Sequence, residues 1–206
     1  MRDMKFQKKY EKRAALFKSF FLPRAFSLIE LLVAVSIFVI ISTVVLANHA
    51  RFNSSVLLGS LAYDIALSIR EAQVFGVSVR QFESGFAVGY GVRFSVSNSY
   101  AFFVDTDSNG RYDEGTDSIL RTYALQRGHT ILRFCGTMTD GVEKCSDSGT
   151  PITHLDVVFI RPDPDAILSS GDPGFYSEGK VVVSSPGGET RTVTVASTGQ
   201  ISVENE

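Results

Sequence analysis

Residues 26–47 read FSLIELLVAVSIFVIISTVVLA, a run that is apolar apart from a few hydroxyls and one acid. As a helix rising about 1.5 Å per residue, the run would span roughly 33 Å, which is enough to cross the hydrocarbon core of a bilayer. Glu30 is its single charged residue. A carboxylate in a membrane-length helix is costly to bury and usually has a partner. The run therefore predicts a membrane helix whose glutamate has a specific role.

The segment before this run is strongly basic. Residues 1–25 contain eight lysines and arginines against one aspartate and one glutamate. The positive-inside rule therefore predicts that this end stays in the cytoplasm and that the rest of the chain lies outside. An ordinary signal anchor would share this charge and hydropathy. A signal peptide cleaved after Val45-Leu46-Ala47 is another alternative, although the run exceeds the usual apolar core of about 7–15 residues.

At the junction of the two segments, Pro23-Arg24-Ala25 is followed directly by Phe26-Ser27-Leu28-Ile29-Glu30. This junction resembles the processing site of type IV prepilins and of the pseudopilins of type II secretion. The resemblance implies that a prepilin peptidase cuts between Ala25 and Phe26, and that the new amine of Phe26 is methylated. It also implies that Glu30 pairs with the amine of a neighbouring subunit, since either charge alone is unfavourable in hydrocarbon. The family usually has glycine before the cut, where this chain has Ala25.

The part of the chain after residue 25 is acidic. It keeps 12 lysines and arginines against 20 aspartates and glutamates, a formal charge of about −8. Nucleic-acid binding normally requires a basic patch, so we expect no nucleic-acid partner.

Both cysteines, Cys135 and Cys145, lie in the part that is predicted to be exported. In an oxidising compartment two cysteines ten positions apart favour a disulfide that closes a small loop. The alternative is two free thiols. A zinc site is not expected, because His129 is the one histidine close by in sequence and a structural zinc ion needs four ligands.

Helical periodicity continues beyond the apolar run. From Leu58 to Phe75 the apolar residues recur at steps of three and four, which predicts one packed helical face. Gly76 fits a helix C-terminus. We expect one helix from about Phe26 to Phe75. The predicted regions are a leader at 1–25, a membrane and assembly helix at 26–47, an amphipathic continuation at 48–76 and an extracytoplasmic β domain at 77–206.

Beyond Gly76 the apolar period changes to two, which is typical of β-strands. Asn98-Ser99 lies between two alternating runs and predicts a hairpin. Expected strands lie at 77–80, 92–96, 100–104, 119–123, 131–134, 155–160, 181–183, 192–195 and 201–203, with loops after Val104, between the cysteines and at 162–179. The predicted fold class is therefore α+β, with a long N-terminal helix packed on a C-terminal antiparallel sheet or sandwich, which agrees with a pilin-like architecture.

Three later stretches narrow the resemblance. Residues 67–74 (LSIREAQV), 103–115 (FVDTDSNGRYDEG) and 191–201 (RTVTVASTGQI) are similar to stretches of pseudopilin H and of the FimT-type minor pilins, the GspH/FimT group. Their order along the chain supports this narrower resemblance.

The loop after Val104 has the residue types of a calcium site. Position twelve of an EF-hand-type loop falls on Thr116 instead of a glutamate, with Asp117 one place later, and no second EF-hand helix follows. The alternative is a polar turn, where Asp, Asn and Gly are favoured for backbone reasons alone. The candidate ligands, at positions 1, 3, 5, 7 and 9, are Asp105, Asp107, Asn109, the carbonyl of Arg111, and Asp113.

No nucleophile motif, general base or cofactor loop accompanies these features, so we expect a structural protein and not an enzyme. The resemblance implies a minor pilin or pseudopilin of the GspH/FimT type. Its implied partners are the prepilin peptidase, the membrane and other pilins in a filament. Its implied location is the bacterial cytoplasmic membrane, with the C-terminal domain outside, and then the filament. The alternative is a membrane-anchored binding module that uses the Asp105 loop for calcium; no other cofactor is expected.

Overall fold

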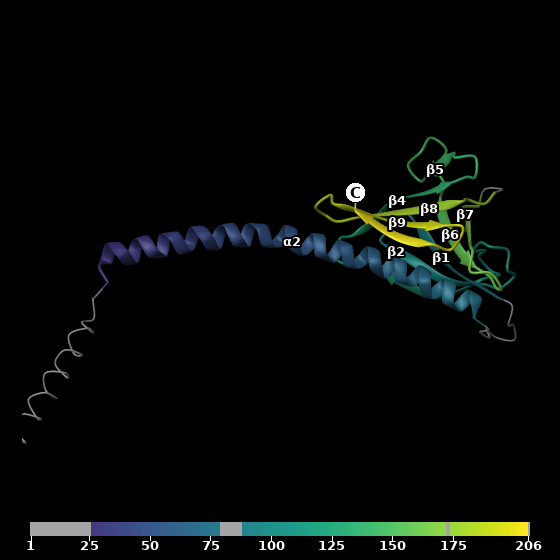
Figure 1. The fold of residues 1–206 in the computed structure, drawn as a ribbon, viewed down its shortest axis with the longest axis horizontal. Coiled ribbons are helices and arrows are strands. Elements are labelled where there is room, and N and C mark those ends of the chain that lie inside the picture. The colour runs from purple at the N-terminus through teal and green to yellow at the C-terminus, as the bar shows by residue number, and fades with distance from the viewer. Residues whose placement is uncertain (1–25, 79–87, 172–173, 206) are drawn as a thin grey trace, which may run out of the picture. The chain divides into compact units, whose positions relative to one another are not determined.

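A computed structural model describes residues 26–78, 88–171 and 174–205 (Figure 1). Helix α2 begins at Leu28 and ends at Val77. The chain divides into two compact units, residues 1–48 and 49–206. In the first unit, the described side chains from Phe26 to Leu46 are exposed, apart from the half-buried Ser42. One stretch, Leu28–Leu46, is long and apolar enough to cross a membrane.

In the second unit, the described residues form ten strands in two antiparallel sheets. In the first sheet the order is β3 (Ser118–Ala124), β2 (Ser99–Asp105), β1 (Gly89–Ser95), β6 (His154–Phe159) and β7 (Ala166–Ser169). In the second sheet it is β10 (Ile201–Asn205), β9 (Thr190–Ala196), β8 (Glu178–Ser184), β4 (Thr130–Thr137) and β5 (Glu143–Cys145). The chain is thus an α+β protein with antiparallel sheets packed on a helix, and the predicted fold class is confirmed.

The predicted hairpin is confirmed by the pairing of β1 with β2, in which Phe94 lies opposite Tyr100. The other alternating runs also coincide with strands, from β3 to β10, although β1 and β6 end one residue before the predicted ends at Val96 and Ile160. Two short strands were missed, β5 and β7, because β5 is polar and β7 is only four residues long, so neither shows a period of two. Both lie where loops were predicted.

The helix end was predicted two residues too early. Val77 was assigned to a strand, but it is the last residue of α2, and Ser78 forms a bend. The backbone N–H of Ser78 donates to the carbonyl of Val74, which continues the helical pattern by one more hydrogen bond. The rest of the strand predicted at 77–80 lies outside the described residues.

The core of the second unit lies between α2 and the sheets. The predicted inner helical face is confirmed, since Leu58, Ile65 and Ile69 are fully buried. Each such side chain contributes roughly 1.5–3 kcal/mol through removal of apolar surface from water. At the helix end, the Phe75 ring packs edge-on against Tyr90 of β1 and Phe102 of β2. These contacts hold the second half of α2 along the first sheet (Figure 1).

Candidate functional site: the helix start and the acidic loop

Ser27 caps the start of α2. Its Oγ accepts a hydrogen bond from the backbone N–H of Glu30 at 3.2 Å, and its carbonyl accepts one from Leu31 at 3.1 Å. Serine at the cap with glutamate three residues later is the sequence pattern of a capping box. Glu30 therefore lies in the first turn of the helix, exposed among apolar side chains. Ala25, on the other side of the predicted cut, lies outside the described residues.

The charge balance at this helix start depends on where the chain begins. The first turn carries the positive end of the helix dipole. An ammonium on Phe26 would add a second positive charge at the same end, and Glu30 is the one acid in that turn. A carboxylate near the amine relieves this repulsion, whether it comes from the same helix or from a neighbouring one.

Two hydroxyl side chains farther along the apolar stretch, Ser36 and Thr43, are hydrogen-bonded within the helix. Ser36 Oγ donates to the carbonyl of Leu32 and Thr43 Oγ1 donates to that of Val39, each at 2.8 Å. A hydroxyl bonded in this way can enter hydrocarbon without leaving a donor unpaired. Glu30 is thus the one residue of Leu28–Leu46 that carries a charge into the apolar stretch.

Asp105, at the end of β2, organises the acidic loop. It is fully buried; its Oδ2 accepts the N–H of Gly110 at 2.8 Å and its Oδ1 accepts that of Asn109 at 3.1 Å. Gly110 has φ of 81°, a conformation that glycine adopts without strain. Burial and a hydrogen bond with Asp107 raise the pKa of Asp105 to about 6, and hydrogen bonds from the Gly110 and Asn109 amides oppose that rise.

Asp117 closes the loop from its other end. Its Oδ1 accepts the N–H of Thr106 at 2.8 Å, and its Oδ2 accepts the N–H of Asp113 at 2.7 Å. Oxygens of Asp105, Asp107 and Asp117 lie within 4.8 Å of one another. Asp117, one residue beyond position twelve of the EF-hand spacing, is therefore the third carboxylate of this group.

The other predicted calcium ligands are arranged differently. Asn109 turns its amide nitrogen toward the carboxylates of Asp107 and Asp113, at 3.0 and 2.6 Å, and its Oδ1 accepts the N–H of Arg111. Asp113 does not belong to the three-carboxylate group. The predicted set is thus brought together only in part, through Asp105 and Asp107. The sequence spacing did not identify Asp117 as a candidate ligand, because its position beside Asp105 depends on how the loop folds back toward β2.

An ion pair between the buried Asp156 and the half-buried Arg93 fastens the acidic loop to the first sheet. Asp156 of β6 is fully buried; its Oδ2 accepts the N–H of Tyr112 at 3.1 Å, and Oδ1 lies 3.6 Å from Nε of Arg93. Arg93 also donates to the carbonyl of Tyr112 at 3.0 Å. Burial raises the pKa of Asp156 to about 6, although Arg93 opposes the rise. Burial, together with Arg93 and Arg111, lowers the pKa of nearby His154 to about 4.

Two of the stretches that support the narrower resemblance meet in space. Gln73, from 67–74, donates through Nε2 to the carbonyl of Gly199, from 191–201, at 3.2 Å. The same nitrogen donates to the carbonyl of Pro164 at 2.8 Å. The Gln73 side chain thereby connects the loops at Pro164 and Gly199 to the end of α2, so the stretches at 67–74 and 191–201 are in direct contact.

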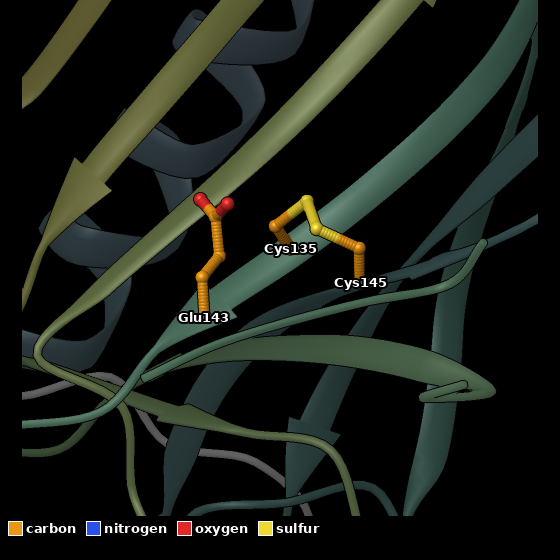
Figure 2. Close-up of side chains that lie close together, drawn as sticks. All are labelled: Cys135, Glu143 and Cys145. Atoms are coloured by element: carbon orange, nitrogen blue, oxygen red, sulfur yellow. A yellow bond between two sulfur atoms is a disulfide. The ribbon is translucent and has the colours of Figure 1, made fainter. Parts of the chain in front are cut away.

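Cys135 and Cys145 lie opposite one another on β4 and β5 and form a disulfide. Figure 2 shows the carboxylate of Glu143 beside the two sulfurs, and Oε1 of Glu143 also lies 3.1 Å from Nζ of Lys180. Because each sulfur is bonded to the other, neither is a thiolate that could bind zinc. This cluster therefore fastens the short edge strand β5 to β4.

The comparisons with known proteins concern the helix start. Residues 23–46 match the family model described as the prokaryotic N-terminal methylation motif. A search of curated proteins and a search of solved structures each found no match. The matched segment contains the predicted cut site, Phe26 and Glu30, and it implies a prepilin that is processed by prepilin peptidase and assembles with other pilins. The methylation motif places this chain in the type IV pilin-like superfamily.

Proposed function

We propose that this chain is a minor pilin or pseudopilin of the GspH/FimT type, a structural subunit of a type II secretion or type IV pilus filament. The methylation motif at residues 23–46 carries the proposal. In it, Phe26 becomes the methylated N-terminus after cleavage at Ala25. Residues 26–47 first anchor the chain in the cytoplasmic membrane and then enter the filament, while the β domain lies outside.

Glu30 is the assembly residue in this proposal. A carboxylate in the first turn of an apolar helix is stabilised by the amine of a neighbouring subunit, and that pairing fixes the axial register of the two chains. The order of the stretches at 67–74, 103–115 and 191–201 supports the GspH/FimT assignment, and so does the Gln73–Gly199 hydrogen bond that joins two of them. The work of such a subunit is done by its surfaces, without a catalytic site.

Mass spectrometry of the mature N-terminus tests this proposal. The full-length chain is expressed with a prepilin peptidase and recovered from the membrane, and the expected first residue is methylated Phe26. A variant with a bulky residue at the cut, Ala25→Leu, is the matched control and should keep its leader. A wild-type chain that begins at Met1 would support a plain signal anchor, and one that begins at Asn48 would support a cleaved signal peptide. Either result overturns the pilin assignment.

Calcium binding by the acidic loop is the second candidate function, and the meeting of three carboxylates favours it. Oxygens of Asp105, Asp107 and Asp117 lie within 4.8 Å of one another, and a divalent cation would relieve their mutual repulsion. The expected result is a higher melting temperature in millimolar calcium that is absent in magnesium and in Asp107→Asn. An unchanged melting temperature would leave turn formation as the role of the loop.

A further inference from the structure

Strand β3 is the longest of the four strands at the edges of the two sheets. It has seven residues, whereas the edge strands β10, β7 and β5 have five, four and three. Among the described residues β3 pairs with β2 alone, and a register shift beside Phe102 leaves residues 121–124 as its longest regular stretch. An edge strand with a free side can accept a further strand.

The free side of β3 carries the backbone groups of two residues. The N–H of Leu125, directly after β3, donates to the carbonyl of Asn98 in the turn before β2 at 2.7 Å. The backbone groups of successive residues in an antiparallel strand point to alternate sides. Those of Tyr123 therefore face β2, and those of Thr122 and Ala124 face away from it, toward the free side.

Two adjoining cavities lie between this free side and α2, with volumes of about 330 and 510 Å³. Both are lined by Leu61 and Asp64 of α2 and by Ala124 and Gln126, so together they form one groove, the α2–β3 groove. Thr122 lines the larger cavity. A strand that pairs with Thr122 and Ala124 would therefore lie along this groove and direct every second side chain into it.

The two cavities differ in charge. In the larger one Asp64 is the one charged lining residue, beside the stacked rings of Tyr100 and Tyr123. A lysine side chain fits these surroundings, because its ammonium pairs with the carboxylate while its stem packs on the rings. The smaller cavity is also lined by Arg127 and by His129, whose buried Nε2 has no hydrogen-bond partner among the described residues. A carboxylate fits there, since the guanidinium and a protonated imidazole both donate to it.

Asp64 and Arg127 are both exposed, and neither forms an ion pair with another described residue. Two charges of opposite sign thus line adjoining cavities without a partner. Side chains on one face of a strand recur every second residue, about 7 Å apart. An extended segment with an acid and a base two positions apart therefore matches both cavities.

We propose that the α2–β3 groove binds an extended segment of a partner protein, which adds to β3 as an antiparallel sixth strand of the first sheet and carries the pattern Glu-x-Lys. Strand β3 runs from Thr122 toward Arg127, so an antiparallel segment meets Arg127 first and Asp64 second. Backbone hydrogen bonds supply the affinity and the two cavities supply the sequence preference. The inference goes beyond the proposed function and does not depend on it, because it concerns a face of the β domain and not the processed helix start.

Binding of a synthetic hexapeptide tests this pattern. The probe, acetyl-Thr-Glu-Val-Lys-Val-Thr-amide, is titrated to millimolar concentration against fluorescently labelled full-length protein in detergent, and binding is followed by microscale thermophoresis. We expect saturable binding that is at least about fivefold tighter than that of the peptide with Glu and Lys exchanged. Equal affinities would overturn the charge pattern, and a lack of saturable binding would overturn the groove as a site for a strand.

N-methylation of the probe distinguishes strand addition from a charge contact alone. A methyl group on the nitrogen of the valine between Glu and Lys removes the donor that faces Ala124, and it should weaken binding at least about fivefold. A methyl group on the backbone nitrogen of the lysine is the matched control, because that N–H points away from β3. Equal losses from the two modifications would exclude addition to β3.

Variants of the protein supply an independent readout. Asp64→Asn should weaken binding of the probe several-fold, and Asp64→Arg combined with Arg127→Glu should reverse the preference, so that the exchanged peptide binds more tightly. Glu204→Arg, which changes an exposed acid on β10, is the control and should leave the affinity unchanged. A double variant that still prefers the original order of charges would contradict the roles of Asp64 and Arg127.

Discussion

Gly76 of α2 lies directly against the backbone of Phe159 in β6, and a Cβ on Gly76 would come within 2.8 Å of the Phe159 carbonyl carbon and closer still to its oxygen. Backbone cannot move aside as a flexible side chain can, so only glycine allows this approach of helix to sheet. Gly76, which the sequence pattern predicted as a helix C-terminus, is thus required for close packing of α2 on β6, and α2 continues past it to Val77.

Gly76→Ala should therefore destabilise the chain by about 2 kcal/mol, because the methyl group forces α2 away from β6. Gly59→Ala is the matched control. A Cβ there meets nothing within 4 Å, and alanine should stabilise the helix by up to about 1 kcal/mol. Denaturant unfolding of the full-length protein in detergent measures both. Equal effects of the two substitutions would show that helix propensity, and not the contact with Phe159, decides the outcome.

Glu30→Leu should leave cleavage and methylation at Phe26 intact but reduce incorporation into filaments by at least tenfold. The helix becomes more apolar, so membrane insertion is retained, while the partner of the neighbouring amine is lost. Glu30→Gln removes the charge but keeps the size of the side chain, and it should reduce incorporation into filaments to a similar extent. Mass spectrometry of the membrane fraction and quantification of the chain in sheared filaments give the two readouts. Normal incorporation of Glu30→Leu would contradict the pairing.

Stability should fall as the pH rises from about 4 to about 6. The pKa values of Asp105 and Asp156 are raised to about 6 in the fold, so the folded chain binds more protons there than the unfolded chain does in this range. His154, whose pKa is lowered to about 4, has the opposite effect, since its unfolded form takes up the proton. Two carboxyl groups against one imidazole leave a net loss of stability with rising pH.

Variants separate these contributions. Asp156→Asn removes one of the two carboxyl groups and should flatten the pH profile, because Asp105 and His154 then oppose one another. His154→Gln should make the loss with rising pH steeper. Urea unfolding at pH 4, 5, 6 and 7 checks each case. A wild-type chain that gains stability between pH 4 and pH 6 would contradict these assignments.

Replacing Cys135 and Cys145 together by serine should lower the free energy of unfolding by about 2–3 kcal/mol, since the cross-link restricts the unfolded chain. Strand β5 is three residues long and pairs with β4 alone, so its loop should become the first protease-sensitive site. Limited proteolysis with and without a reducing agent tests this. Ser146→Ala is a control, because it removes only a side-chain hydrogen bond to the Phe134 amide in the same region.

Features that depend on a local sequence pattern could be predicted without the structure. The membrane helix follows from an unbroken apolar run, the inner face of α2 from steps of three and four, and most strands from alternation, because each is a local periodicity. The proposed processing site at Ala25 and Phe26 and the proposed role of Glu30 rest on local motifs as well, and the match at residues 23–46 covers the same segment. Strands β5 and β7 escaped prediction because three or four residues are too few to show a period.

Only the tertiary structure decided which distant residues meet. It places β6 between β1 and β7, brings Asp117 beside Asp105, buries Asp156 against Arg93 and holds Gly199 on Gln73. It also separates the apolar residues of α2 into a covered face and an exposed one, which a single sequence cannot distinguish. Periodicity indicates which side chains share a face of a helix or strand. The burial, the pKa values and the contacts of those side chains depend on what packs against that face. Long-range pairing of the strands decides what packs there.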